Sequence, residues 1–230
     1  MEITAILLSR ALGFVETADL RPREGLFFPD VAKELVQHCN FQKFPRTFEE
    51  GPGSDDGAQF FAGKWNKVVI EKLVFYNDGL LVDTRSGTAE SKRIIEELLV
   101  WAREKLRTIA GPEIVREWAY VSNLTFRSDV PLLVTGPIER LAKSITTEIS
   151  KDTRRETVYE PTGFNIAHDQ LLRKHARASF TLQRRAGIPL SDNRYYSEAP
   201  LPTETHIALL EQYERDVAEM LNPRLLAARS

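Results

Sequence analysis

The fold is decided by residues 64–108, which read KWNKVVIEKLVFYNDGLLVDTRSGTAESKRIIEELLVWAREKLRT. Apolar side chains occupy both alternating sets of positions from Val68 to Tyr76, and Asn77-Asp78-Gly79 follows directly. This pattern predicts a central strand, and Asn and Gly tolerate the positive φ angles of a tight reversal. A hairpin is therefore expected, with its second strand at residues 80–82.

A long amphipathic helix is predicted from about Ala89 to Arg107. Apolar residues recur there at helical spacing: Ile94, Ile95, Leu98, Leu99, Ala102 and Leu106. Thr88 is the expected N-cap, and Glu90 in the first turn complements the helix dipole. Strand, loop and helix together form the predicted centre of the fold.

Further elements are predicted on both sides of this centre. Towards the N-terminus, we expect a strand at residues 2–16, a helix that begins near Pro29 and closes near Asn40, and a loop at residues 44–58. Towards the C-terminus, we expect a strand at 116–128, a helix to about Ile149, extended stretches within 155–167 and 177–186, an irregular stretch from Pro189 to Pro202, and a helix from Thr203 to about Leu221.

The helix ending near Ile149 opens at Gly136-Pro137 and has an apolar stripe. Its stripe consists of Ile138, Leu141, Ala142 and Ile145. Because such a stripe usually faces the protein interior, these residues are expected to form the inner face of the helix.

The predicted element order is β-α-β-β-α-β-α-β-β-α. Hairpins mixed with crossing helices favour an α+β fold, with a mainly antiparallel or mixed sheet and helices packed on it. Residues 1–230 are interpreted as a single domain, and a subdivision near residues 130–150 is the alternative.

Composition narrows the class of protein. The 31 Lys and Arg residues and 33 Asp and Glu residues give a net charge of −2, whereas a dedicated duplex-DNA binder is usually strongly basic. Cys39 is the only cysteine, which excludes an internal disulfide, favours a reducing cytoplasmic setting and suggests a small apolar core residue. No stretch has the roughly 18–20 apolar residues of a membrane span, so no membrane association is expected.

The loop between the second hairpin strand and the long helix is an anion-binding candidate. Backbone N–H groups of a first helical turn can bind phosphate, assisted by hydroxyl groups and a guanidinium. The candidate residues are Asp83, Arg85, Ser86 and Thr88. The alternative is a strand end, a turn and a capped helix with no ligand.

A basic segment extends from Lys151 to Arg194. It contains nine Lys or Arg residues and five acids, whereas the first sixty residues contain six basic and ten acidic residues. This segment could bind a nucleic acid backbone, an acidic partner surface or a second copy, or form a solvated strand face. Residues 184–202 are the preferred contact surface because loop aromatics are often exposed at interfaces. The interface candidates are Arg177, Arg184, Arg185, Arg194, Tyr195 and Tyr196.

Catalytic motifs are not found. The sequence contains no HExxH, GxGxxG, Walker loop or Gly-x-Ser-x-Gly, so no metal site and no cofactor are expected. His168-Asp169 is the one adjacent pair with acid–base potential. His206 is expected to be a surface residue in the first turn of the final helix.

Two hypotheses about function follow. The first is a non-enzymatic binding or assembly subunit that contacts a protein partner or copies of itself through its basic C-terminal half. The second is an enzyme acting on a phosphorylated or nucleotide-like substrate, in which the Asp83–Thr88 loop binds phosphate and His168 or Asp169 supplies acid–base catalysis. The sequence alone does not decide whether the protein is an enzyme.

Overall fold

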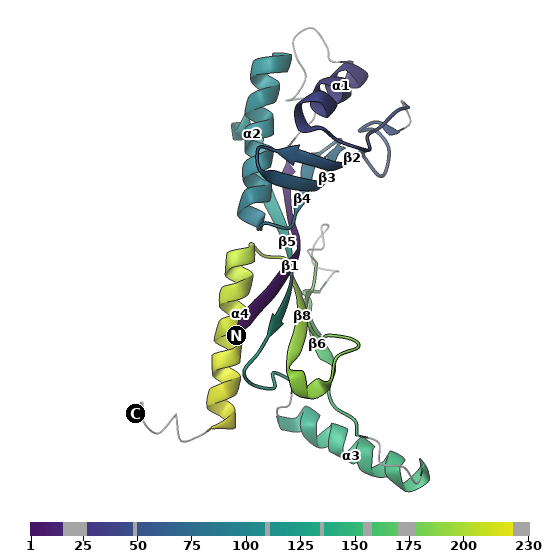
Figure 1. The fold of residues 1–230 in the computed structure, drawn as a ribbon, viewed down its shortest axis with the longest axis vertical. Coiled ribbons are helices and arrows are strands. Elements are labelled where there is room, and N and C mark those ends of the chain that lie inside the picture. Colours follow the sequence, from purple (N-terminus) through teal and green to yellow (C-terminus); the bar gives the residue numbers. More distant parts are fainter. Residues whose placement is uncertain are drawn as a thin grey trace. The chain divides into compact units, whose positions relative to one another are not determined.

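The computed structural model describes residues 1–15, 27–47, 50–108, 111–133, 136–153, 158–169 and 178–222 (Figure 1). Within these ranges the helices and strands are, in chain order, β1 (Glu2–Phe14), α1 (Phe28–Cys39), β2 (Ala58–Trp65), β3 (Val68–Tyr76), β4 (Gly79–Thr84), α2 (Thr88–Leu106), β5 (Glu117–Arg127), α3 (Gly136–Thr153), β6 (Gly163–Ile166), β7 (Phe180–Arg184), β8 (Arg194–Ala199) and α4 (Thr203–Leu221).

The strands of the described chain form an eight-stranded sheet. Their order is β2-β3-β4-β1-β5-β8-β7-β6. Antiparallel pairing joins β1 to β4, β2 to β3, β3 to β4, β6 to β7 and β7 to β8. The predicted α+β class with an antiparallel sheet is therefore confirmed.

Two observed strands were not predicted. β8 lies inside the stretch from Pro189 to Pro202, so that prediction is wrong for residues 194–199. β2 begins at the end of the expected loop and forms a tight hairpin with β3, in which Asn66 has a φ of 52°. Both strands are stabilised by pairing with a neighbouring strand, and local sequence patterns predict such pairing poorly.

The described residues divide into two compact units. Unit 1 comprises the described residues within 1–5, 124–198 and 205–230, and unit 2 comprises those within 6–123 and 199–204. The chain passes from one unit to the other at four places, two of which lie inside β1 and β5. The prediction of a single domain stays a prediction.

The core of unit 2 forms around the predicted central hairpin. Tyr76 pairs with Gly79 at its turn, and all six residues of β4 are buried. Helix α2 contributes Ile94, Ile95, Leu98 and Leu99 to the same hydrophobic cluster. Fully burying one such side chain contributes about 1.5–3 kcal/mol, so the packing of α2 is a major stabilising term.

Helix α1 supplies a second layer of this core. Cys39 is fully buried in the hydrophobic cluster, and burial raises the pKa of its thiol to about 12. The thiolate is therefore disfavoured, and the interpretation of Cys39 as a core residue is confirmed. Asn40 ends α1 in the left-handed region with a φ of 52°, as expected for a closing residue.

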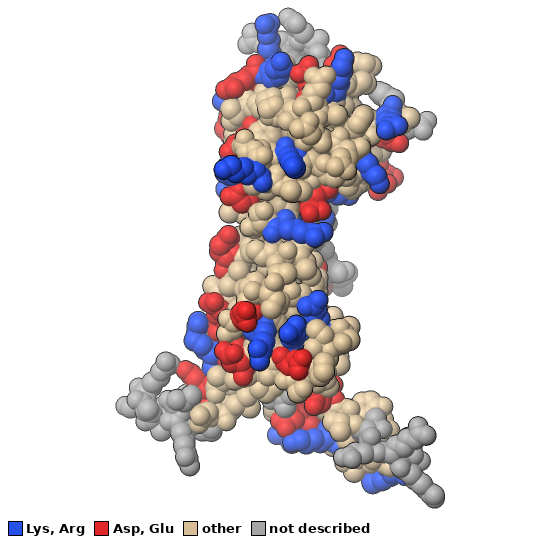
Figure 2. Space-filling model, viewed as in Figure 1, with Lys and Arg blue, Asp and Glu red and all other residues tan. Residues whose placement is uncertain are grey.

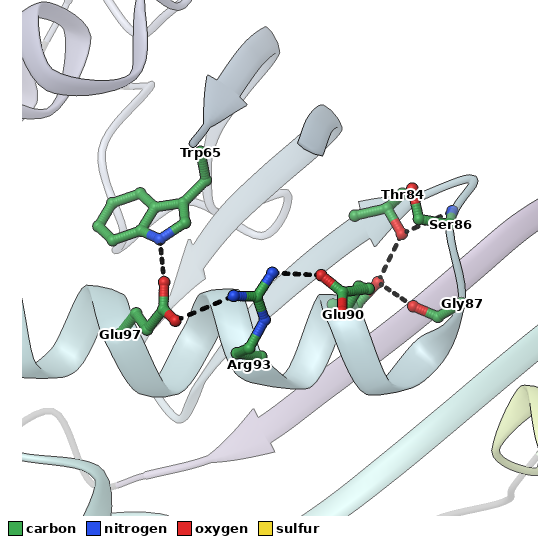
Figure 3. A network of polar contacts seen from close by, with 8 residues as sticks. Trp65, Thr84, Ser86, Gly87, Glu90, Arg93 and Glu97 are labelled. Carbon is green, nitrogen blue, oxygen red and sulfur yellow. Dashed lines mark hydrogen bonds and ion pairs between the residues drawn. The ribbon is translucent and has the colours of Figure 1, made fainter. Parts of the chain in front are cut away.

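The outer face of α2 carries a chain of polar contacts (Figure 3). Arg93 bonds Glu90 on one side and Glu97 on the other, and Glu97 also accepts the indole N–H of Trp65 on β2. These groups are partly solvated, so the ion pairs add little stability. The indole contact ties β2 to the helix.

In unit 1, two tyrosine hydroxyls bond the backbone N–H and the backbone carbonyl of one residue, Leu132. The hydroxyl of Tyr195 accepts the backbone N–H of Leu132 at 2.9 Å, and the hydroxyl of Tyr213 donates to the Leu132 carbonyl at 2.9 Å. Tyr195 is fully buried and its ring stacks on Phe126. The segment that follows β5 is thereby fastened to β8 and α4.

Among the described residues, the helices are too short or too polar to cross a lipid bilayer.

Replacing Tyr195 by Phe tests this fastening. The substitution leaves the Leu132 N–H without an acceptor, and we expect the free energy of unfolding to fall by about 1–3 kcal/mol. Tyr159→Phe is the matched control, because Tyr159 is exposed and its change should stay within about 0.5 kcal/mol. Urea unfolding followed by circular dichroism measures both, and equal midpoints for the two variants would contradict the assignment.

Candidate functional site

The loop predicted to bind an anion joins β4 to α2, but its first residue has a partner within the chain. The guanidinium of Arg10 donates from Nε to Asp83 Oδ1 at 2.7 Å and from a terminal nitrogen to Asp83 Oδ2 at 2.8 Å. Asp83 is buried, whereas Arg10 is about one-third exposed. The bidentate contact compensates the cost of burying the carboxylate.

Thr88 is also engaged within the chain. Its hydroxyl accepts the backbone N–H of Thr203 at 2.8 Å, and its own backbone N–H donates to the Thr203 hydroxyl at 3.1 Å. The first residues of α2 and α4 thus satisfy each other reciprocally. The prediction of Thr88 as an N-cap is wrong, since Gly87 precedes the helix and the Thr88 hydroxyl bonds another segment.

A buried group of hydroxyls continues from this contact. The Ser91 hydroxyl donates to the Ser9 carbonyl at 2.7 Å and lies 2.9 Å from the Thr84 hydroxyl. Thr84 in turn accepts the backbone N–H of Ser86 at 3.3 Å. The loop is held by bonds within unit 2.

Two of the four anion-binding candidates remain at the surface. Arg85 and Ser86 are exposed, and Arg85 lies 3.2 Å from the carboxylate of Glu71 on β3. Asp83 and Thr88 are buried with the partners described above. The structure therefore does not bring the four side chains together around an open space, and anion binding stays a prediction.

Removing either threonine hydroxyl should show how much the reciprocal contact contributes to the free energy of unfolding. In Thr88→Val the Thr203 N–H loses its acceptor, and in Thr203→Val the Thr88 N–H does, so we expect each variant to lose about 1–3 kcal/mol of unfolding free energy. Thr205→Val, at an exposed position of α4, serves as the control and should change little. Chemical denaturation measures all three; losses near zero at both buried positions would contradict the role of the contact.

The interface candidates in β7 and β8 separate into buried and exposed residues. Arg184 is nearly buried, pairs with Glu160 at 3.0 Å and lies over the ring of Tyr195. Tyr195 itself is fully buried, so the expectation that both tyrosines are exposed is wrong for Tyr195. Side chains along β8 alternate between the two faces of the sheet, and this alternation points Tyr195 into the core. An irregular stretch would not require such an orientation.

The remaining interface candidates are less buried. Arg185 and Arg194 are exposed and their backbones are joined by a hydrogen bond of 2.9 Å. The Tyr196 hydroxyl donates to Glu198, and burial together with this carboxylate raises the pKa of Tyr196 to about 12. Arg177 lies outside the described residues.

Figure 2 shows basic and acidic side chains interspersed on the face in view. Such mixing is typical of an ordinary solvated surface rather than of a continuous nucleic-acid groove. Within the basic segment, residues 154–155, 173–174 and 177 lie outside the described ranges.

His206 forms a contact that resembles a catalytic pair. Its Nε2 lies 2.9 Å from the hydroxyl of Ser197, which donates to the Thr181 carbonyl at 2.8 Å. Both side chains are fully buried, so the expectation of a surface histidine is wrong and a substrate has no access to the pair. His168 and Asp169 are exposed after β6 and each has an interaction within the chain.

Two hollows lie near residues 43–47 in unit 2. One has a volume of about 330 Å³ and includes Lys43, Glu50 and Asp56, and the other, of about 310 Å³, lies between α1 and the segment after it. Both reach only the small end of ligand pockets. Neither contains a residue predicted to act in binding or catalysis.

The prediction that the apolar stripe of α3 faces the protein interior is also wrong. Ile138, Leu141 and Ile145 are exposed by 56%, 61% and 38%, respectively, although they were expected to form the inner face of the helix. Periodicity identifies which side chains share a face, but it does not show whether another element covers that face. We call Ile138, Leu141 and Ile145 the α3 face.

Two further exposed apolar residues lie beside α3. The backbone N–H of Tyr159 donates to the Thr146 hydroxyl at 2.9 Å, which holds the returning chain against the third turn of the helix. Val158 and Tyr159 are exposed by 66% and 43%. Both are exposed apolar residues in the segment that this hydrogen bond joins to α3.

Within the described ranges, no three His, Cys, Asp or Glu side chains gather closely enough to hold a metal ion. Comparison with family models, curated proteins and solved structures finds no match to the chain.

Proposed function

We propose that this protein is a binding or assembly subunit that contacts a protein partner or a second copy of itself through the α3 face. The observation that carries the proposal is the exposure of Ile138, Leu141 and Ile145 on one side of α3. Leu and Ile side chains at successive helical turns are the usual anchors when a helix binds a groove or another helix.

Single exposed apolar side chains are common on protein surfaces, whereas a group of them indicates an interaction site. Monomeric proteins rarely present large contiguous apolar patches, and those that do generally use them for interaction. On α3 the exposed residues recur at intervals of three and four positions, and Val158 and Tyr159 lie close to the same helix. This arrangement supports a specific contact surface.

The basic C-terminal half has a secondary role in this proposal. Arg185 and Arg194 are exposed and could steer an acidic partner, whereas Arg184 is committed to Glu160. A nucleic acid partner has weaker support, because basic and acidic side chains are interspersed on the face shown in Figure 2. The buried lone thiol of Cys39 fits action in the cytoplasm.

The enzyme hypothesis has less support from the geometry. Asp83 and Thr88 are satisfied by Arg10 and Thr203, which leaves Arg85 and Ser86 as exposed donors. We therefore expect phosphate and nucleotides to leave the melting temperature unchanged. A site with a Kd of about 0.1 mM would stabilise the fold by about 2.7 kcal/mol at about 10 mM ligand, which a thermal-shift assay detects readily. A rise that Arg85→Ala abolishes would instead support the enzyme.

Replacing Leu141 by Glu tests the proposed function. Immobilised chain is incubated with lysate of its host and, separately, with untagged copies of itself, and retained proteins are quantified by mass spectrometry. We expect a retained species that is lost in Leu141→Glu, because a charge in the centre of the α3 face opposes burial.

The matched control is Leu209→Glu, at a leucine of α4 that is 50% exposed. This variant should retain the same species as the unmodified chain. Retention that is identical for Leu141→Glu and the unmodified chain, or no retention of any protein including the chain itself, would contradict the proposal.

A further inference from the structure

We propose that the hollow of about 310 Å³ beside α1 binds a small amphipathic carboxylate, whose apolar chain contacts the helix and whose carboxylate contacts two cationic side chains. We call this hollow the α1 groove. Its described lining consists of residues of α1 and residues 44–47, all of which lie in unit 2. The inference therefore goes beyond the proposed function, which rests on the α3 face.

The first wall of the groove follows from how α1 meets the core. Leu35 and Cys39 are buried in the hydrophobic cluster, whereas Phe28 and Val36 are only partly buried against it. Ala32 lies between these two at a spacing of four residues and has a much smaller side chain. Because residues four apart are neighbours on a helix face, the short side chain leaves a notch between two larger ones.

The second wall is held in place by the edge of the sheet. The backbone N–H of Gln42 donates to the Phe61 carbonyl at 3.1 Å, and the N–H of Phe61 donates to the Lys43 carbonyl at 2.8 Å. These bonds fix the segment after α1 against β2. Phe44 and Pro45 follow directly and line the groove opposite the helix, so the apolar surface is preformed.

The charged side chains among the described lining residues are both cations. Lys33 on α1 and Arg46 after it are exposed, and neither forms an ion pair with a described residue. The Arg46 guanidinium lies 5.7 Å from the centre of the Phe44 ring, and this cation–π contact keeps it beside the apolar lining. The groove therefore combines carbon-rich walls with two positive charges.

The neighbouring acids are engaged elsewhere and do not belong to the described lining. Glu34 pairs with Lys105 at 3.8 Å, and Glu50 accepts the backbone N–H of Arg46 and lines the other hollow. Asp30 lies in the first turn of α1, where it complements the helix dipole. The two cations of the groove thus keep a net positive charge to offer to a ligand.

This combination determines the class of ligand. Ligand pockets generally have an apolar lining with a few polar groups that fix orientation, and a volume of about 310 Å³ suits a small molecule. A guanidinium can form two parallel hydrogen bonds with one carboxylate, and a nearby ammonium adds a second favourable charge. A short alkyl chain with a carboxylate head satisfies both parts of the groove.

Calorimetric titration of the full chain with sodium octanoate tests the inference. We expect a dissociation constant on the order of 0.1 mM, which is within reach of a ligand with about ten non-hydrogen atoms. Butanoate should bind at least about tenfold more weakly, because each buried methylene contributes a factor of about four. Octylammonium should not bind, because its cationic head would meet the two cations of the groove.

Substitution of the two cations tests their role. Lys33→Ala and Arg46→Ala should each weaken octanoate binding about threefold, and the double variant about tenfold. Lys67→Ala is the matched control, at an exposed lysine in the turn between β2 and β3, and should bind octanoate like the unmodified chain. Since all three side chains are exposed, circular dichroism should show every variant folded.

The outcomes decide the inference without reference to α3. The absence of octanoate binding, equal affinity of the unmodified chain and the double variant, or equal affinity for octanoate and octylammonium would each overturn it. Octyl phosphate bound at least about tenfold more tightly than octanoate would overturn the choice of a carboxylate. Retention of a partner through Leu141 is measured separately, so the proposed function can stand when this inference fails.

Discussion

The burial of β4 is the constraint on which unit 2 depends. All six of its residues are buried, and it pairs with β1 on one edge and with β3 on the other. Asp83 lies in this strand, opposite Arg10 in the β1 register, so the same backbone pairing places the guanidinium that satisfies the carboxylate. A shift of the pairing register by one residue would turn each side chain of β4 to the opposite face of the sheet.

The loop after β4 follows from the same constraint. Polar groups next to a buried strand must find partners, and the nearest ones belong to segments distant in sequence, such as Thr203. The hydroxyl groups at the start of α2 therefore form hydrogen bonds within the chain. The residue types that form a phosphate site and those that join two helix starts are the same, so their pattern alone does not separate the two roles.

Helix α3 presents the opposite situation. Its apolar stripe is as regular as that of α2, yet three of its large side chains are exposed while those of α2 are buried. Complete burial of a Leu or Ile side chain contributes about 1.5–3 kcal/mol, and these three side chains have gained only part of it. We therefore place the proposed contact surface on this helix rather than on strands β7 and β8, still within the C-terminal half of the chain.

By itself, the sequence determined the α+β class, the hairpin at Asn77-Asp78-Gly79, the extent of α2 and the core position of Cys39, because these depend on local periodicity, turn chemistry and composition. Tertiary structure alone decided that Tyr195 and His206 are buried, that Arg10 neutralises Asp83 and that the α3 face is uncovered. Each of those outcomes depends on whether a segment distant in sequence lies against the residue, and local sequence does not determine this.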